Sequence, residues 1–199
     1  MTEDLVFVER TQSGDMAAFR ELVERHKKNV YYLALDMTGN HHDAEDLSQE
    51  VFIKAYKNIG GFRADAKFSS WLYRITMNTC IDQNRKKSVK AMRLKETFDE
   101  THIPTHESFG SDVVKSPDKK AEAGLMQKHI DQALQKLTDK ERSVFVLRHY
   151  QHLQLNEIAD VLKITVGTVK STLFRALQRL QKELAFYKAD LGLENSHEL

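Results

Sequence analysis

The chain has 199 residues, enough for one or two small domains, and its 30 lysines and arginines nearly balance its 29 aspartates and glutamates, for a formal net charge of +1. The overall charge therefore points to no particular partner. A single cysteine, Cys80, excludes an internal disulfide and favours a reducing compartment. The N-terminal residues lack the pattern of a signal peptide, and no apolar run approaches the roughly 18 residues of a membrane-spanning helix. We expect a soluble, cytoplasmic protein.

The sequence predicts an all-α protein with two helical domains joined by a flexible linker. Helical periodicity covers residues 1–95 and returns over 119–188, and a tail follows at 189–199. Residues 96–118 contain both prolines and a single base, Lys115. They also contain six acids: Glu96, Asp99, Glu100, Glu107, Asp112 and Asp118. Such an acidic, proline-containing stretch is typical of an extended linker.

Three helices are expected in the first segment. Asp15 can cap the first, whose apolar stripe runs from Phe19 to Met37 at three- and four-residue spacing. The second covers 42–58, with Ala44, Leu47, Val51 and Ala55 on its inward side. After Gly60-Gly61, a loop at 62–70 leads into a third helix at 70–87 that ends in several bases.

The second segment predicts a helix-turn-helix. Thr138 and Glu141 have the spacing of a capping box upstream of it. A short helix around Ile158 and Leu162 is followed by the three-residue turn 163–165, and Thr165 can cap the next helix. The buried side of that longer helix is formed by Val166, Val169, Leu173, Ala176, Leu177 and Leu180. A short support helix, a tight turn and a longer recognition helix are the parts of this DNA-binding motif.

The opposite side of the longer helix is basic and suited to duplex DNA. Residues 163–188 carry six bases and one acid, Glu183, so phosphates should bind there in a salt-dependent way. Arg175 can donate two hydrogen bonds to guanine, and Phe174 can lie on a thymine methyl. The outward residues are Gly167, Thr168, Ser171, Phe174, Arg175, Gln178 and Lys182. The alternative is a basic amphipathic helix that only packs in a bundle.

Three strings carry a resemblance to a known family. EIADVLKITVGTVKSTLFRAL (157–177) resembles region 4.2 of extracytoplasmic-function (ECF) sigma factors, which are bacterial transcription initiation factors, and LTDKERSVFVLRHY (137–150) resembles region 4.1. HDAEDLSQEVFIKAYKNIGGFRADAKFSSWLYRITMNTCIDQNRKK (42–87) resembles region 2. The resemblance covers nearly the whole chain outside the linker and the tail. It implies a protein that is not an enzyme, needs no cofactor or metal, and recruits core RNA polymerase to promoters.

The resemblance also implies a role for each part of region 2. DAEDLSQEVF (43–52) resembles the segment that docks on core polymerase, which implies contacts from Asp46, Gln49, Glu50 and Ile53; a solvated acidic face is the alternative. The loop 62–70 and the helix after it resemble the part that holds the separated strand of the −10 promoter element. The residues implied there are Arg63, Phe68, Ser69, Ser70, Trp71, Arg74 and Asn78, with Arg85 and Lys86 along duplex phosphates. Cations and flat side chains suit single-stranded DNA, although Trp71 is equally suited to anchor the core.

In region 4 the resemblance implies that the recognition helix reads the −35 element as duplex. The residues expected to touch DNA are Thr168, Lys170, Ser171, Phe174, Arg175 and Gln178. The resemblance also implies an anti-sigma factor as a partner, and an acidic linker that threads toward the active-site cleft of polymerase.

Three positions depart from the family pattern. Lys163 stands at a turn position that is often glycine, so it must adopt a left-handed backbone or another turn. Gln154 replaces the usual serine or threonine cap of the support helix. Thr172 stands where arginine is common, which implies one DNA contact fewer.

Two other functions are compatible with parts of the sequence. His42-Asp43, with His26, His41 and Asp46 nearby, is compatible with a metal phosphohydrolase, but that chemistry needs further ligands converging from other helices. A stand-alone helix-turn-helix regulator would bind DNA tightly alone, usually as a dimer. Cys80 as a redox switch lacks support, because a buried thiol usually only packs.

Overall fold

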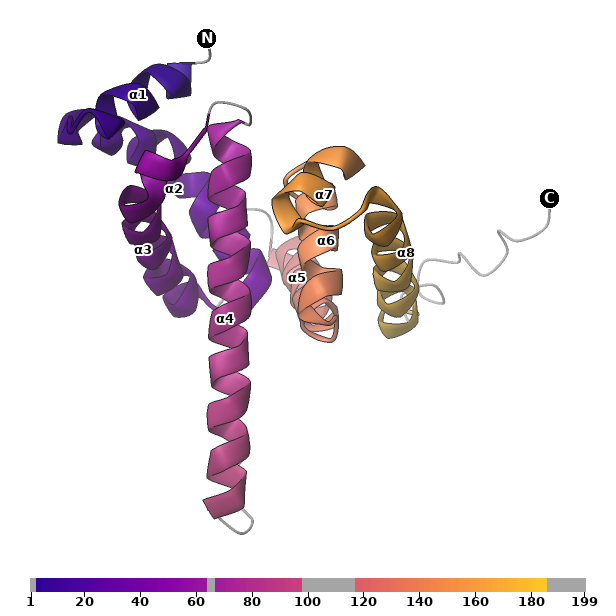
Figure 1. Ribbon diagram of the computed structural model, residues 1–199. Helices are drawn as coiled ribbons and strands as arrows, with labels where there is room; N and C mark the ends of the chain where they lie inside the picture. The colour runs from indigo at the N-terminus through magenta and orange to yellow at the C-terminus, as the bar shows by residue number, and fades with distance from the viewer. Residues whose placement is uncertain (1–2, 64–66, 98–116, 186–199) are drawn as a thin grey trace, which may run out of the picture.

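The computed structural model describes residues 3–63, 67–97 and 117–185, which are helical with short connections and contain no strand (Figure 1). The first domain consists of α1 (Glu3–Gln12), α2 (Met16–Thr38), α3 (His41–Asn58), a 3-10 turn (Ile59–Gly61) and α4 (Phe68–Thr97). The second consists of α5 (Pro117–Gln135), α6 (Asp139–His149), α7 (Leu155–Leu162) and α8 (Val166–Glu183). The all-α fold is confirmed. Most of the predicted linker and the whole predicted tail lie outside the described residues.

The ends of α2 follow local rules that the sequence displays. The Asp15 carboxylate accepts hydrogen bonds from the N–H groups of Ala17 and Ala18, at 2.9 and 3.2 Å, as expected of a cap. At the other end Gly39 adopts a left-handed backbone with φ 68°, which glycine enters without steric cost. The side chain of Asn40 then caps α3 by accepting from Asp43 N–H at 3.0 Å. The helix α1 was not predicted.

A first apolar cluster holds the N-terminal domain together. It is built from α1 through α4 around Val8, Leu22, Val30, Val51 and Leu72. Each of these residues is buried. The contributions of α2 and α3 follow from the apolar stripes that the sequence predicts, whereas that of α1 does not.

The helix α4 differs from its prediction at both ends. It begins at Phe68, two residues inside the predicted loop, and ends at Thr97, ten residues beyond the predicted end. Its C-terminal half extends past the helices of both domains in Figure 1. Nothing in 88–97 breaks a helix, because this stretch contains neither proline nor glycine.

The second domain packs directly against the first. A small cluster of Ala133, Leu134, Leu137, Ala176 and Leu180 joins α5 to α8. A larger cluster continues from one domain into the other. It combines Leu33, Met37, Tyr73, Met77 and Cys80 of the first domain with Val144, Leu147, Ile158, Val161 and Val169 of the second. In addition, α7 lies against α4, and α5 and α6 lie against α2.

Candidate functional site

The helix-turn-helix is formed by α7, the turn 163–165 and α8. Lys163 adopts a left-handed backbone with φ 54° and ψ 45°, so this chain keeps the usual turn without glycine. Thr165 caps α8 through its hydroxyl, which accepts from Thr168 N–H at 3.1 Å. The helix α7 has no cap from the Gln154 side chain; instead, the Glu157 carboxylate accepts from Gln154 N–H at 2.9 Å.

The outward side of α8 carries the residues that the sequence predicted for the −35 element. Lys170, Ser171, Arg175 and Gln178 are exposed, and Thr168 is half-buried. Phe174 is 61% exposed, a large apolar side chain in water. The structure thus brings a phenyl ring, a guanidinium, an ammonium and small hydroxyls onto one face of one helix, which is the chemistry that reads base edges and phosphates.

Two positions on α8 differ from the sequence-based expectation. Leu177, expected on the buried side, is 43% exposed and extends the apolar part of the surface one turn beyond Phe174. Thr172 is buried, and its hydroxyl accepts from the Arg175 guanidinium at 3.3 Å. The residue that replaces the family arginine therefore orients Arg175.

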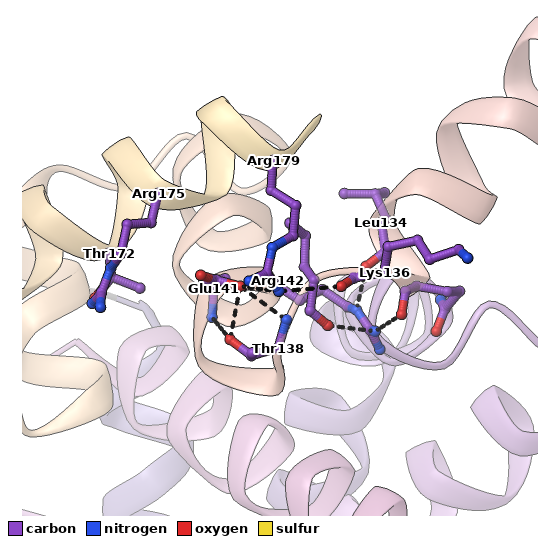
Figure 2. A network of polar contacts seen from close by, with 10 residues as sticks. Leu134, Lys136, Thr138, Glu141, Arg142, Thr172, Arg175 and Arg179 are labelled. Atoms are coloured by element: carbon purple, nitrogen blue, oxygen red, sulfur yellow. Dashed lines mark hydrogen bonds and ion pairs between the residues drawn. The ribbon is translucent and has the colours of Figure 1, made fainter. Parts of the chain in front are cut away.

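A polar network fixes α8 to the rest of its domain (Figure 2). Arg179 of α8 lies 3.1 Å from the Glu141 carboxylate of α6. The same carboxylate accepts from the N–H and hydroxyl of Thr138 at 3.0 and 2.9 Å, and completes the predicted capping box. Burial opposes ionisation of Glu141, but these hydrogen bonds and the charge of Arg179 outweigh it and lower the pKa of Glu141. Arg179 is thus a positioning residue rather than a free cation.

The predicted −10 surface lies on α4 and on the turn before it, and the structure places its residues unequally. Asn78, Arg85 and Lys86 are exposed, and Arg63 is exposed just before residues 64–66. Ser69 and Ser70, expected in a loop, lie half-buried in the first turn of α4. Asn78, Arg85 and Lys86 lie within about 100° of one another around the helix, whereas Ser69 lies about 180° from Asn78.

The aromatic residues of this surface pack against one another. Phe68 is only 3% exposed and belongs to the core of the first domain, so it is not available to DNA in this arrangement. Trp71 is half-buried, with its ring centroid 5.3 Å from that of Phe62 and 5.5 Å from that of Phe68. Trp71 therefore packs against the core of the first domain, while part of its ring remains accessible to solvent.

Arg74 is placed in an unusual setting. It is half-buried, and its Nε atom is buried without a hydrogen-bond partner among the described residues. A buried donor without a partner is unfavourable, because the water it lost is not replaced. Further along α4, Arg85 lies 3.2 Å from Asp82, and Lys87 pairs with Asp43 of α3.

The predicted polymerase-binding residues share one face of α3. Asp46, Gln49 and Ile53 are exposed and Glu50 is half-buried, on the side opposite the inward residues. Ile53 is 55% exposed, so this face combines an apolar side chain with acids. His42 lies 3.8 Å from Asp46, and Lys54 lies 2.8 Å from Glu50.

The phosphohydrolase alternative finds no support in the geometry. The ring of His26 packs on Phe68, and its Nε2 lies 3.0 Å from Asp4 of α1, so His26 is a core histidine. No group of three or more histidine, cysteine or acidic side chains in the described part of the chain could hold a metal. No helix within the described residues is long and apolar enough to span a membrane.

Two buried polar groups were missed by sequence reasoning. Arg142 is 5% exposed and donates four hydrogen bonds to main-chain oxygens, three within its own domain and one to Met37 of α2. Asp36 lies half-buried where α2 meets the second domain. No local pattern marks either residue, because both owe their setting to the contact between domains.

Comparisons with known proteins agree with this geometry. Residues 22–90 match the model of Sigma-70 region 2, and residues 128–180 match that of Sigma-70 region 4. The chain is 38% identical over 177 residues to the ECF RNA polymerase sigma factor SigW of Bacillus subtilis, covering 89% of this chain and 94% of that protein. It is 32% identical over 186 residues to the RNA polymerase sigma-H factor of Pseudomonas aeruginosa, covering 92% and 94%.

A solved structure has a similar fold. The sigma factor RpoE of Bartonella quintana, in complex with the anti-sigma factor NepR, superposes with a TM-score of 0.63 at 23% identity. The match covers 84% of this chain and 96% of that one.

Proposed function

We propose that three helices of this chain each bind a different partner. The chain belongs to the family of ECF RNA polymerase sigma factors. In this proposal α3 docks on core RNA polymerase, α4 holds the separated strand of the −10 element, and α8 reads the −35 element as duplex. The chain itself does no chemistry, works in the cytoplasm, and directs polymerase to a set of promoters.

The exposed surface of α8 is the main support for this proposal. Phe174 stands in water at 61% exposure beside the Arg175 guanidinium, while the caps and the Glu141–Arg179 pair hold the helix rigid beneath them. An exposed ring beside cations on a fixed helix suits a major groove, where the ring meets a thymine methyl and Arg175 meets guanine. A stand-alone repressor would share this surface but would have no need of the polar residues Asn78, Arg85 and Lys86 on one side of α4.

The other two surfaces are assigned by their chemistry. The face of α3 presents Asp46, Gln49 and Ile53 to solvent, which fits a partner with basic and apolar groups. On α4, Asn78 and Arg85 can hydrogen-bond a base and neutralise a phosphate. An anti-sigma factor is the inhibitor expected of such a chain, by covering one or more of these surfaces.

Run-off transcription with core polymerase and selected promoters tests the assignment. Arg175→Ala is expected to abolish dependence on the −35 element while polymerase binding is unchanged. Asn78→Ala is expected to impair promoter opening, measured by permanganate reactivity of unpaired thymines, and to leave polymerase binding intact. Lys28→Ala, which removes an exposed cation of α2 outside the three surfaces, is the control. If Arg175→Ala and Asn78→Ala both transcribe like the parent chain, the assignment is wrong.

A further inference from the structure

The helix α1 lies at the end of the first domain where α4 begins (Figure 1). It packs on α2 and on the 3-10 turn Ile59–Gly61, which leads into the predicted −10 surface. Asp4, Val8 and Gln12 recur at a spacing of four, so they share one side of α1. Val8 is buried in the apolar cluster of this domain. The packed side of α1 therefore has one polar residue on each side of its apolar contact.

Gln12 holds the 3-10 turn from outside. Its Nε2 atom donates to the main-chain oxygen of Ile59 at 2.7 Å and to that of Phe62 at 3.2 Å. A side-chain amide has two N–H groups, so one glutamine can serve both oxygens. Between these two oxygens lie Gly60 and Gly61. Glycine constrains the backbone least, so the Gln12 amide bridges the part of the connection that is least able to hold its own shape.

The hydrogen bond to Phe62 acts directly on Arg63. The carbonyl of Phe62 and the N–H of Arg63 belong to one planar peptide unit. A bond to that oxygen therefore orients the plane, and with it the direction in which the Arg63 side chain leaves the main chain. The Phe62 side chain is 7% exposed, with its ring centroid 5.3 Å from that of Trp71. Gln12 thus fixes the main chain at the point where the core ends and the exposed Arg63 begins.

Asp4 supports the start of α4 through an intermediate residue. Its carboxylate lies 3.0 Å from Nε2 of His26, and a carboxylate only accepts, so His26 is the donor. The His26 ring packs on Phe68, the first residue of α4, with 5.3 Å between ring centroids. The Phe68 ring centroid in turn lies 5.8 Å from that of Phe62. The same helix therefore supports the residues that precede and follow Arg63 in this aromatic cluster.

The position of α1 is itself fixed by contacts with α2. Arg10 pairs with Asp15, the cap of α2, at 2.7 Å, and Arg25 of α2 pairs with Glu3 at 2.6 Å. Such exposed ion pairs contribute little to stability, but they join both ends of α1 to the neighbouring helix.

We propose that α1 positions the −10 surface without contacting DNA, and that Gln12 is the positioning residue through which it acts on Arg63. This inference rests on the proposed function, with Arg63 among the residues that contact the separated strand. Loss of the Gln12 donors should then weaken capture of the unpaired −10 strand, and should leave binding of polymerase and of the −35 element unchanged.

Binding of a single-stranded oligonucleotide to the holoenzyme tests this role. The probe is a fluorescein-labelled non-template −10 strand of a promoter that the chain transcribes, followed by anisotropy with the complex of core polymerase and each variant. Gln12 is exposed, so Gln12→Met removes both donors at similar length without entering the core. We expect the dissociation constant to rise at least about fivefold, the weaker end of the range for one base contact. Binding of a duplex −35 fragment should be unchanged.

Gln132→Met is the matched control, because it removes an exposed glutamine amide from α5. It should bind the oligonucleotide like the parent chain. If Gln12→Met also binds like the parent, or if it weakens both DNA fragments equally, the proposal is overturned.

A double variant separates positioning from a general loss of structure. If Gln12 acts through Arg63, adding Gln12→Met to Arg63→Ala should cause no further loss of oligonucleotide binding, because no guanidinium remains to be misplaced. Circular dichroism confirms that the variants stay helical. Additive losses would overturn the proposal, and so would an Arg63→Ala variant that binds like the parent.

The role of α1 and the proposed function fail separately. A parent holoenzyme that does not bind the −10 oligonucleotide contradicts the proposed function. A parent holoenzyme that binds it, with Gln12→Met binding equally well, contradicts only the role of α1.

Discussion

Arg179 of α8 forms an ion pair with Glu141 of α6, with 3.1 Å between Nη1 and Oε2, and this pair joins the recognition helix to the capping box of its neighbour. The Glu141 carboxylate is shielded from solvent and also accepts hydrogen bonds from the N–H and the hydroxyl of Thr138. Three groups therefore depend on one carboxylate, which makes it a stability determinant of the second domain.

Glu141→Gln is expected to lower the free energy of unfolding by about 1–2 kcal/mol, because the amide still accepts from Thr138 but loses the charge that pairs with Arg179. Chemical denaturation followed by circular dichroism measures the change. Lys182→Ala, which removes an exposed cation from the same helix, should change it by less than about 0.5 kcal/mol. Equal effects of the two substitutions would show that the ion pair contributes nothing specific.

Phe174→Ala should separate DNA recognition from stability. The ring is 61% exposed, so its loss is expected to change the free energy of unfolding by less than about 0.5 kcal/mol. Transcription from a cognate promoter should fall about tenfold, equivalent to about 1.4 kcal/mol, if the ring contacts a thymine methyl. Tyr32→Ala, which removes a 56% exposed ring from α2 away from the DNA-facing side of α8, is the control. A destabilised Phe174→Ala variant would indicate that the ring packs within the protein.

Asp36 makes stability depend on pH. Burial, together with the nearby charge of Asp131, raises the pKa of Asp36 from 3.8 to about 7. The folded chain therefore binds this proton more tightly than the unfolded chain, and the contribution to stability is full below about pH 4 and is lost as the pH rises through 7. A titratable neighbour is Tyr150, which directly follows α6, and burial together with these two carboxylates raises its pKa to about 12.

Asp36→Asn replaces the ionisable carboxyl group with an amide that does not titrate. Denaturant unfolding between pH 4 and pH 8 is expected to show stability decreasing with pH more steeply for the parent chain than for Asp36→Asn. The difference between the two slopes isolates Asp36 from other titrating groups. Parallel pH profiles would mean that Asp36 ionises normally in the folded chain.

Cys80 should be inert in the native protein. Burial raises the pKa of its thiol to about 12, and the side chain is fully enclosed. Because the thiolate is the reactive form, a disulfide reagent such as DTNB should label the native chain very slowly and the denatured chain at once. Rapid labelling of the native chain would contradict this prediction and would support a redox role for Cys80.

The sequence by itself determined the caps of three helices and the position of the turn before α8. Asp15, Thr138 and Thr165 cap the helices that they were expected to cap, and the turn at 163–165 is where its flanking residues predict it. These features depend on residues two to four positions apart, so they can be read along the chain. The family resemblance rests on the same local strings.

Only the tertiary structure decided which side chains remain exposed to solvent. Phe68 and Phe174 are both phenylalanines in helices of predicted DNA-binding segments, yet one is in a core and the other is in water. Arg142 and Asp36 look like surface residues in the sequence but lie buried or half-buried where the two domains meet. Helical spacing fixes which residues share a face, whereas burial depends on which distant helix packs over that face, and that packing is set by the whole chain.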